Sequence, residues 1–547
     1  MTEFDSTQNI VNSHSLETVE NGAPKTKQKH KKFVNLLIKL AVLLILKAHF
    51  IWATIYFVTN SDDTLDSTTC TGYGFWMIIY IFIYFIIFYN VLLKPYIIPF
   101  ISNLTSKYLS PQLKKIPFWP LVSRGVILAA ILAFIVYDCR DDFSRLMPLT
   151  GLVIFFIIGF LFSSAKKQIP WPTVISGLIA QFILGLLMIR WDTGRNIFSC
   201  VGDRVDTFLN YAVNASAFVY SEELVLKQAI FAFNALAAIY LMNFCINILY
   251  YYGIMQAIVV DLGKILQFVL GTPICESVNS AANIFLGMSE SPFLLKPFLD
   301  HLTDSEIHSI MTSGFASVSG TVLAAYISFG ANPAHLVTSC VMSAPAALCY
   351  SKLMYPETEE VVVTHENVKT IKMKFGSVLD AAIKGANEAS QVVIGIIANL
   401  ISFIAFVYFI NGVLGWLGTL VGFVAEDEIW SLELILGKIL IPLSYTMGVK
   451  WDDCEKVGQL IGMKTILNEF IAFQKMQHME LSSKSRIIAT YSICGFANPG
   501  SIGTMLSTLT IFMPRKKHSV TKLVFRAFIG GSFACFMTAC IAGLLTV

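Results

Sequence analysis

Long apolar stretches run through most of this 547-residue chain. An α-helix needs about 20 consecutive apolar residues to cross the ~30 Å hydrocarbon core of a bilayer. Charged residues make up only 14% of the chain, against about 25% in soluble domains, so lipid must be the solvent for much of it. We therefore expect an all-α polytopic membrane protein with about eleven transmembrane helices. The candidate spans lie near residues 33–59, 74–93, 119–138, 146–165, 171–190, 229–253, 308–330, 334–350, 391–412, 486–513 and 524–546.

The distribution of lysine and arginine predicts how these spans are oriented, because cytoplasmic loops carry more of both residues. Residues 1–32 end in a basic run and are expected to form a disordered cytoplasmic tail. The loop after the first span is acidic and should face out, whereas the lysines of residues 94–115 and 166–167 should face in. Residues 515–517 also face in, which makes the C-terminus extracellular. Asn214 then faces out and is a candidate glycosylation site.

Two further apolar segments, residues 268–297 and 440–476, are interrupted by glycine, proline and charged residues. Non-helical backbone at membrane depth is tolerated only where protein or a water-filled cavity covers it. We therefore interpret both segments as re-entrant hairpins. Each contains an embedded glutamate, Glu290 in the first and Glu469 in the second.

The two hairpins are followed by matching motifs. Gly314-Phe-Ala-Ser follows Glu290, and Gly495-Phe-Ala-Asn follows Glu469 at nearly the same spacing. One span, near residues 391–412, separates the two copies, so the charge distribution makes the repeats inverted. Inverted repeats with broken helices at corresponding positions are typical of secondary transporters, whose binding site lies near the bilayer midplane at the repeat interface.

Polar residues of the two broken segments are the candidate site residues. Glutamates inside membrane segments are energetically costly and usually functional, although a structural ion pair is the alternative for Glu290 and Glu469. Pro499 removes a backbone donor and should unwind residues 495–501, which places Asn498 and Ser501 in the interior. Their uncharged donors and acceptors suit sugar hydroxyls. A kink that serves packing is the alternative for this break.

A small cation site is the other kind of site that the sequence allows. Asn283 and Ser317, with carbonyls freed by the broken helices, could form an oxygen cage for sodium. The eleven cysteines and nine histidines have no metal-ligand spacing, so no other cofactor is expected. A net charge of +3 is too small to indicate a nucleic-acid partner. No kinase, protease or hydrolase motif occurs, and we do not expect an enzyme.

Several stretches resemble the concentrative nucleoside transporter family, from about residue 119 to the end of the chain. The part of the chain before these stretches is similar only in layout, with a tail and extra spans as in animal members. The matching stretches are Asn283–Pro292, Ile310–Phe315, Ala325–Gly330, Val341–Pro345, Pro356–Glu359, Leu467–Phe470 and Cys494–Asn498.

The resemblance implies a role for each candidate site residue. In this family the first hairpin contacts the nucleobase, the second hairpin and the unwound helix contact the ribose, and oxygens of the first repeat bind sodium. The nucleobase residues are Gly287, Met288, Ser289 and Glu290, with Thr321 and Val322 beside them. The ribose residues are Glu469, Asn498 and Ser501, with Phe496 adjacent. The sodium ligands are Asn283, Ser317 and the carbonyls of Leu286 and Val318.

The resemblance also implies an activity and a setting. It predicts a nucleoside symporter driven by sodium, protons or both, which forms a homotrimer in the plasma membrane and moves by an elevator mechanism. Expected substrates are adenosine, guanosine, inosine and uridine. Many members carry glutamine where this chain has Met288, and methionine cannot make the amide contacts that suit a pyrimidine edge. The purine-preferring animal members are similar at residues 287–288 and 321–322, so we expect a purine bias. Pro499 also departs from the family pattern.

Two alternatives remain, a nucleoside facilitator or channel without cation coupling, and a membrane-embedded enzyme that acts on a nucleotide-linked lipid. The predicted organisation has six parts. They are a tail (1–32), extra N-terminal spans (33–117), scaffold spans with an interfacial helix (118–253), the first hairpin repeat (254–350), a cytoplasmic loop, amphipathic segment and scaffold helix (351–412), and the second hairpin repeat (413–547).

Overall fold

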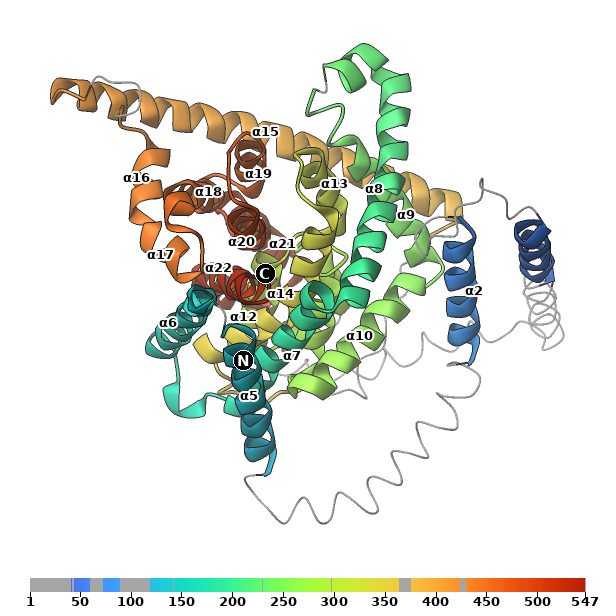
Figure 1. Ribbon diagram of the computed structural model, residues 1–547, viewed down its shortest axis with the longest axis horizontal. Coiled ribbons are helices and arrows are strands. Elements are labelled where there is room, and N and C mark those ends of the chain that lie inside the picture. Colours follow the sequence, from blue (N-terminus) through green and yellow to red (C-terminus); the bar gives the residue numbers. More distant parts are fainter. Residues whose placement is uncertain are drawn as a thin grey trace, which may run out of the picture. The chain divides into compact units, whose positions relative to one another are not determined.

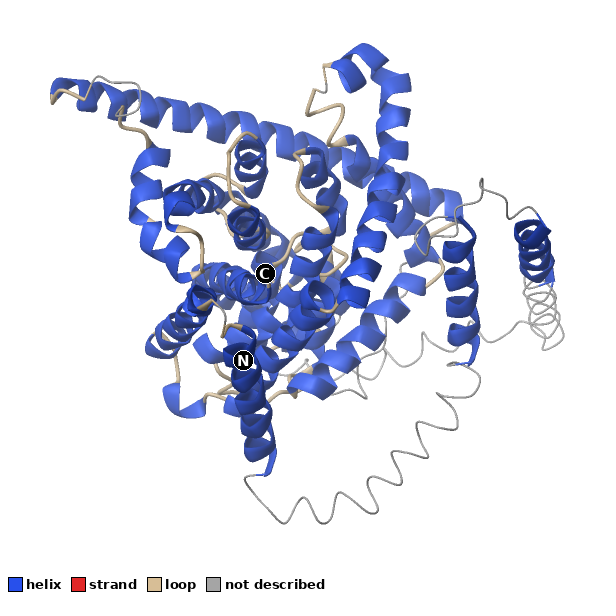
Figure 2. Ribbon diagram, in the orientation of Figure 1, coloured by secondary structure: helices blue, strands red, loops and turns tan. Residues whose placement is uncertain are grey.

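The computed structural model describes residue 41 and residues 44–59, 72–88, 119–140, 142–228, 230–296, 298–363, 375–423 and 429–546. No strand occurs among these residues, so the expected all-α class is confirmed (Figure 2). The chain divides into two compact units, residues 1–115 and 116–547. The expected tail, the acidic first loop and the lysines of residues 94–115 lie outside the described residues.

The smaller unit contains two apolar helices, Leu44–Thr59 and α2 (Gly72–Phe88). Aromatic and hydroxyl groups join them. The Phe50 ring stacks on the Tyr80 ring with 3.9 Å between centroids, and Thr54 Oγ1 lies 2.9 Å from the Tyr73 hydroxyl. The two helices overlap the regions expected to form two extra N-terminal spans, 33–59 and 74–93, and that they cross the bilayer stays a prediction.

The larger unit is a bundle of helices that contains every candidate site residue (Figure 1). Its first half runs through α5 (Trp119–Asp138), α6 (Met147–Leu161), α7 (Trp171–Gly185), α8 (Asp192–Tyr220), α9 (Ala237–Tyr251), α10 (Ile254–Leu270), α11 (Ile274–Ala282), α12 (Asp304–Ala316), α13 (Gly320–Ser328) and α14 (Pro333–Met354). Its second half runs through α15 (Val378–Leu420), α16 (Leu432–Ile439), α17 (Ile441–Thr446), α18 (Cys454–Ile466), α19 (Glu469–Gln477), α20 (Ser483–Ile493), α21 (Pro499–Phe512) and α22 (Lys517–Leu545).

Four helical segments of the described residues are long and apolar enough to cross a bilayer alone, and the pair α9 and α10, bent by 83°, would make a fifth. The four are Phe143–Leu161, Trp171–Arg190, Pro333–Met354 and Pro514–Leu545. Two expected crossings are broken, because the segments near 308–330 and 486–513 each contain an unwound stretch. Those at 119–138 and 391–412 lie in the continuous helices α5 and α15. The number of crossings therefore stays a prediction.

The repeat expected from the sequence is visible in the order of elements. The first copy runs from α11 through the α12–α13 break to α14, and the second runs from α18–α19 through the α20–α21 break to α22. The two copies pack against each other, since α22 contacts α12, α14 and α20, and these helices gather at the centre of the bundle in Figure 1. The long helix α15 packs along α9.

One expectation about the repeats needs correction, and two further features add to the description. The second break covers residues 494–498 only, because Pro499 begins α21 at a position where its missing N–H costs nothing. Ser501 therefore lies in the first helical turn and not in unwound chain. The return limb of the first hairpin contains 3₁₀ turns, Ser291–Leu295 and Leu299–His301, where a helix would make the hairpins equivalent. The span expected at 391–412 is part of the 43-residue helix α15.

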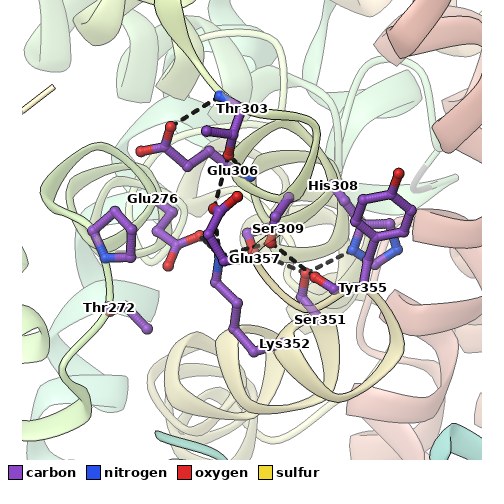
Figure 3. Close-up of polar contacts among 12 residues, drawn as sticks. Thr272, Glu276, Thr303, Glu306, His308, Ser309, Ser351, Lys352, Tyr355 and Glu357 are labelled. Atoms are coloured by element: carbon purple, nitrogen blue, oxygen red, sulfur yellow. Dashed lines mark hydrogen bonds and ion pairs between the residues drawn. The ribbon is translucent and has the colours of Figure 1, made fainter. Parts of the chain in front are cut away.

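A buried polar network fixes the start of the first hairpin to its neighbours (Figure 3). Lys352, near the end of α14, forms ion pairs with Glu276 of α11 at 2.8 Å and with Glu357 at 3.7 Å. Its Nζ also donates to Ser305 Oγ at 2.8 Å. Glu357 in turn accepts from the hydroxyl of Thr303, the residue that caps α12. This network ties α11, α12 and α14 together through one lysine.

Replacement of Lys352 with methionine should destabilise the larger unit, because Glu276 has no exposed surface and would lose its cation. Loss of one partner of a buried ion pair typically costs about 3 kcal/mol or more. The measurement is the thermal midpoint of the detergent-solubilised protein. The exposed i,i+4 pair of Lys227 and Glu223 supplies a matched control, since Lys227→Met should change stability by less than about 1 kcal/mol. Equal midpoints for the two variants would contradict this account.

Candidate functional site

A cavity of about 600 Å³ lies within the larger unit, where both hairpins and both helix breaks meet α9 and α15. Its size falls in the range of about 300–1,000 Å³ that is usual for small-molecule sites. Nine of the ten predicted substrate residues line it. They are Gly287, Met288, Ser289, Glu290, Val322, Glu469, Phe496, Asn498 and Ser501. The side chain of the tenth, Thr321, lies outside what the structure describes.

The first hairpin contributes the turn that follows α11. The Gly287 N–H points toward Glu290 Oε2 at 3.4 Å, and the Gly287 carbonyl accepts from the Ser291 hydroxyl at 3.1 Å. The first bond orients the Glu290 carboxyl at the cavity wall, and the second closes the turn. Met288 is nearly buried against Gly314, where a Cβ atom would come within 2.9 Å of Met288 Cβ. A glycine at the end of α12 is therefore what allows the hairpin turn to approach so closely.

The second hairpin contributes Glu469, the first residue of α19. Its carboxylate is buried and accepts two hydrogen bonds. Oε1 accepts from the Tyr326 hydroxyl at 3.2 Å, and Oε2 accepts from Asn498 Nδ2 at 2.8 Å. Its position at a helix N-terminus also favours negative charge. A carboxylate can accept about four hydrogen bonds, so each oxygen keeps an acceptor site for a ligand hydroxyl.

Asn498 links this carboxylate to the second helix break. Its Oδ1 accepts from the Ser501 N–H at 2.8 Å and so caps α21, while its Nδ2 donates to Glu469. Both ends of the amide are used, which fixes its orientation. The side chains predicted to contact one part of a ligand are therefore brought together by the structure, through a cap and a charge-assisted hydrogen bond.

The predicted sodium residues lie around the first helix break. Asn283 Nδ2 donates to Ser313 Oγ at 2.6 Å, and Ser317 Oγ donates to the Ser313 carbonyl at 3.0 Å. Asn283 Oδ1 is buried and has no hydrogen-bond partner among the described residues. Leu286 and Val318 are buried beside them. A buried amide oxygen without a donor is the kind of ligand that a hard cation requires, so the residues fit a sodium ion.

Some polar residues of the cavity were missed in the sequence. Asn243 and Asn247 of α9 and Glu388 of α15 line the wall that faces the hairpins. Asn247 Nδ2 donates to the Asn243 carbonyl at 3.1 Å and lies 3.5 Å from Glu388 Oε2. A signal was available, because two asparagines four residues apart in an apolar run occupy one face of a helix. Tyr326, which donates to Glu469, had no such signal.

Comparison with protein-family models covers most of the larger unit. Residues 150–223 match the model for the N-terminus of Na⁺-dependent nucleoside transporters, residues 232–333 match a nucleoside-recognition gate model, and residues 335–543 match the model for the C-terminus of Na⁺-dependent nucleoside transporters. The chain belongs to this transporter family.

Known relatives agree with the match. The chain is 38% identical over 477 residues to sodium/nucleoside cotransporter 1 of Oryctolagus cuniculus, covering 84% of this chain and 72% of the relative. It is 38% identical over 439 residues to solute carrier family 28 member 3 of Homo sapiens, covering 77% of this chain. The match spans 63% of that human protein and 62% of its counterpart in Rattus norvegicus.

Solved structures extend the likeness to the fold. The chain is similar to CNTnw in an inward-facing substrate-bound state, with a TM-score of 0.69, 32% identity, and coverage of 74% of this chain and 98% of that one. A variant of CNTnw in an outward-facing state gives a TM-score of 0.70 at 32% identity, covering 74% and 99%. Another CNTnw variant, solved in three intermediate states, is similar as well.

Proposed function

We propose that this chain is a cation-coupled nucleoside symporter that concentrates nucleosides in the cell, with sodium as its coupling ion. The observation that carries the proposal is that Glu290 and Glu469, one from each inverted repeat, line the same cavity. A nucleoside has an uncharged base and a hydroxyl-bearing ribose. The first repeat lines the cavity with the turn at Gly287–Glu290, which suits the base, and the second lines it with Glu469 and Asn498, which suit the ribose hydroxyls. Family membership supplies the substrate class.

The ribose is assigned to the second hairpin. Glu469 keeps acceptor sites for two hydroxyls, and the Asn498 and Ser501 side chains lie beside it with the Phe496 ring. The base is assigned to Gly287–Glu290 and Val322 of the first repeat. Asn283, Ser317 and the carbonyls of Leu286 and Val318 are assigned to sodium. Coupling by protons alone or together with sodium is the variant of this proposal that ion substitution decides.

An elevator motion fits the arrangement of the cavity walls. The hairpins and helix breaks of residues 254–350 and 413–547 form one side, and α9 and α15 form the other. Movement of the first group against the second would open the cavity to either side of the membrane. The CNTnw relatives are described in inward-facing, outward-facing and intermediate states. We further propose a homotrimer in the plasma membrane with a cytoplasmic N-terminus and an extracellular C-terminus.

Uptake with ion substitution tests the proposal. Cells that express the chain should accumulate radiolabelled adenosine above the external concentration in sodium medium, and accumulation should fall in choline medium at neutral pH. Recovery in acidic choline medium would assign part of the coupling to protons. Uptake that equilibrates but never exceeds the external level would indicate a facilitator. No uptake of adenosine or uridine in any medium would overturn the assignment.

Glu469→Gln should lower adenosine uptake by about 100-fold. The change replaces one acceptor oxygen with an NH2 group, which donates, so a ribose hydroxyl loses its acceptor and buried polar groups are left unpaired. The readout is kcat/KM together with the amount of protein at the cell surface. Glu480→Gln is the matched control, since Glu480 is exposed at the end of the same hairpin. Near-normal uptake by Glu469→Gln and by Glu290→Gln would remove the site assignment.

Met288→Gln should shift selectivity toward pyrimidines. Met288 contributes only an apolar surface to the cavity, whereas glutamine offers one donor and one acceptor to a pyrimidine edge. We expect the ratio of uridine to adenosine kcat/KM to rise about 10-fold. Met288→Leu conserves volume and polarity and should keep the purine preference. An unchanged ratio in Met288→Gln would contradict the purine assignment.

A further inference from the structure

The short helix α13 begins at the first helix break, just after Ser317 and Val318, two of the residues that we assign to sodium. The N–H of its first residue, Gly320, donates to the Phe285 carbonyl of the first hairpin at 3.1 Å. A Cβ atom on Gly320 would come within 2.9 Å of that carbonyl oxygen, so this approach needs a glycine. The start of α13 is therefore fixed between the proposed cation ligands and the hairpin turn.

The other end of α13 contacts the second hairpin through Tyr326. This side chain is fully buried, and its hydroxyl donates to Glu469 Oε1 at 3.2 Å. Its ring stacks on the Phe473 ring with 4.7 Å between centroids and lies 5.0 Å from the centroid of the Phe470 ring. All three partners belong to α19. The aromatic packing restricts the direction in which the hydroxyl points, so the hydrogen bond to Glu469 depends on where α13 lies.

Tyr326 reaches Glu469 from outside the cavity. Val322, four residues earlier on α13, is among the described residues that line the cavity, whereas Tyr326 is not. Residues four apart share one face of a helix, so one orientation of α13 sets both contacts. Of the two side chains that donate to Glu469, Asn498 belongs to the second repeat and Tyr326 to the first. Helix α13 is therefore a direct link from the first repeat to the proposed ribose carboxylate.

The length of α13 suits such a link. The helix rises by 1.5 Å per residue, so Gly320 and Tyr326 lie about 9 Å apart along its axis. Its backbone hydrogen bonds make it stiff over this distance, and a shift of its first turn must also move Tyr326. The contact at its start and the contact at Tyr326 are therefore not independent.

We propose that Tyr326 is a positioning residue for the ribose carboxylate, and that α13 transmits occupancy of the sodium site to Glu469. A cation bound by Ser317 and the Val318 carbonyl orders the break and fixes the first turn of α13. Tyr326 then holds one oxygen of Glu469, and the carboxylate presents its remaining lone pairs to the ribose hydroxyls. Bound ribose favours the same position of α13 and so tightens cation binding in return. This inference rests on the function proposed above for the identity of both ligands.

Two tyrosine variants are matched for the test. Tyr326→Phe removes the hydroxyl and keeps the ring that packs on α19. Tyr350→Phe is the control, because Tyr350 is also fully buried and its hydroxyl donates to the Phe155 carbonyl at 3.0 Å, at a position that does not line the cavity. Each variant loses one buried hydrogen bond, so their thermal midpoints should fall by similar amounts. A difference in ligand binding between them then reports where the bond was lost.

Transmission is tested by calorimetric titration of the wild type and both variants with adenosine, in sodium buffer and in choline buffer. Sodium should tighten adenosine binding at least 10-fold in the wild type and in Tyr350→Phe, but less than about 3-fold in Tyr326→Phe. A wild-type factor in Tyr326→Phe, or an equal loss in both variants, would overturn transmission through α13. If the wild type binds no adenosine, the proposed function itself fails. If it binds adenosine without any effect of sodium, sodium coupling fails and transmission fails with it.

Positioning is tested separately with 2′,3′-dideoxyadenosine, which keeps the base and lacks the two ring hydroxyls that Glu469 would accept from. In sodium buffer, the affinity for adenosine relative to this analogue should fall about 5-fold in Tyr326→Phe and stay unchanged in Tyr350→Phe. The sodium dependence does not enter this ratio, so it decides the positioning role even where transmission fails. An unchanged ratio in Tyr326→Phe would show that the tyrosine only packs, and would overturn that role.

Discussion

The Phe496 N–H donates a hydrogen bond to the Ser317 carbonyl over 3.2 Å, and this bond joins the two places where helices are unwound inside the bundle. Backbone groups at membrane depth must find partners within the protein, because lipid offers none. The two unwound segments therefore cross, and each supplies part of the hydrogen bonding that the other's backbone needs. Close approach is possible because Gly495 has no Cβ, which would come within 2.9 Å of the Phe315 carbonyl.

The site follows from this crossing. Unwinding ends α12 beside Ser317 and delays the start of α21 until after Asn498, so side chains of both repeats reach one cavity. Asn498 is then free to cap α21 and to hold Glu469. The residues that we propose for the cation in the first repeat and those that we propose for the ribose in the second meet at the same crossing. Such contact would allow coupling between ion and substrate, because each ligand would favour the state that the other binds.

Much of this organisation was predictable from the sequence, because the bilayer strongly restricts which residues a membrane segment can contain. Proline, glycine and glutamate in apolar runs pointed to the breaks, and the repeated motif at Gly314 and Gly495 pointed to their pairing. The residue-level roles came from resemblance to a family and stay proposals. The break at residues 494–498 ended earlier than predicted, because proline at the first position of a helix favours the helix that follows.

Other features depend on packing that no local pattern records. The two hairpins are asymmetric, since the first has 3₁₀ turns at Ser291–Leu295 where the second has helix α19. Glu276 lay inside the first broken segment, yet its partner Lys352 lies far along the chain, near the end of α14. Tyr326 reaches Glu469 across 143 residues of sequence. Long-range contacts of this kind are set by the fold as a whole.

The most direct test of coupling across the crossing is calorimetric titration of the purified protein with adenosine, in sodium buffer and in choline buffer at the same pH and ionic strength. We predict that sodium tightens adenosine binding at least 10-fold, and that adenosine tightens sodium binding by the same factor, as linkage requires. In Asn283→Leu the adenosine affinity should be the same in both buffers. Equal adenosine affinities in sodium and choline for the wild type, at neutral and at acidic pH, would contradict the account.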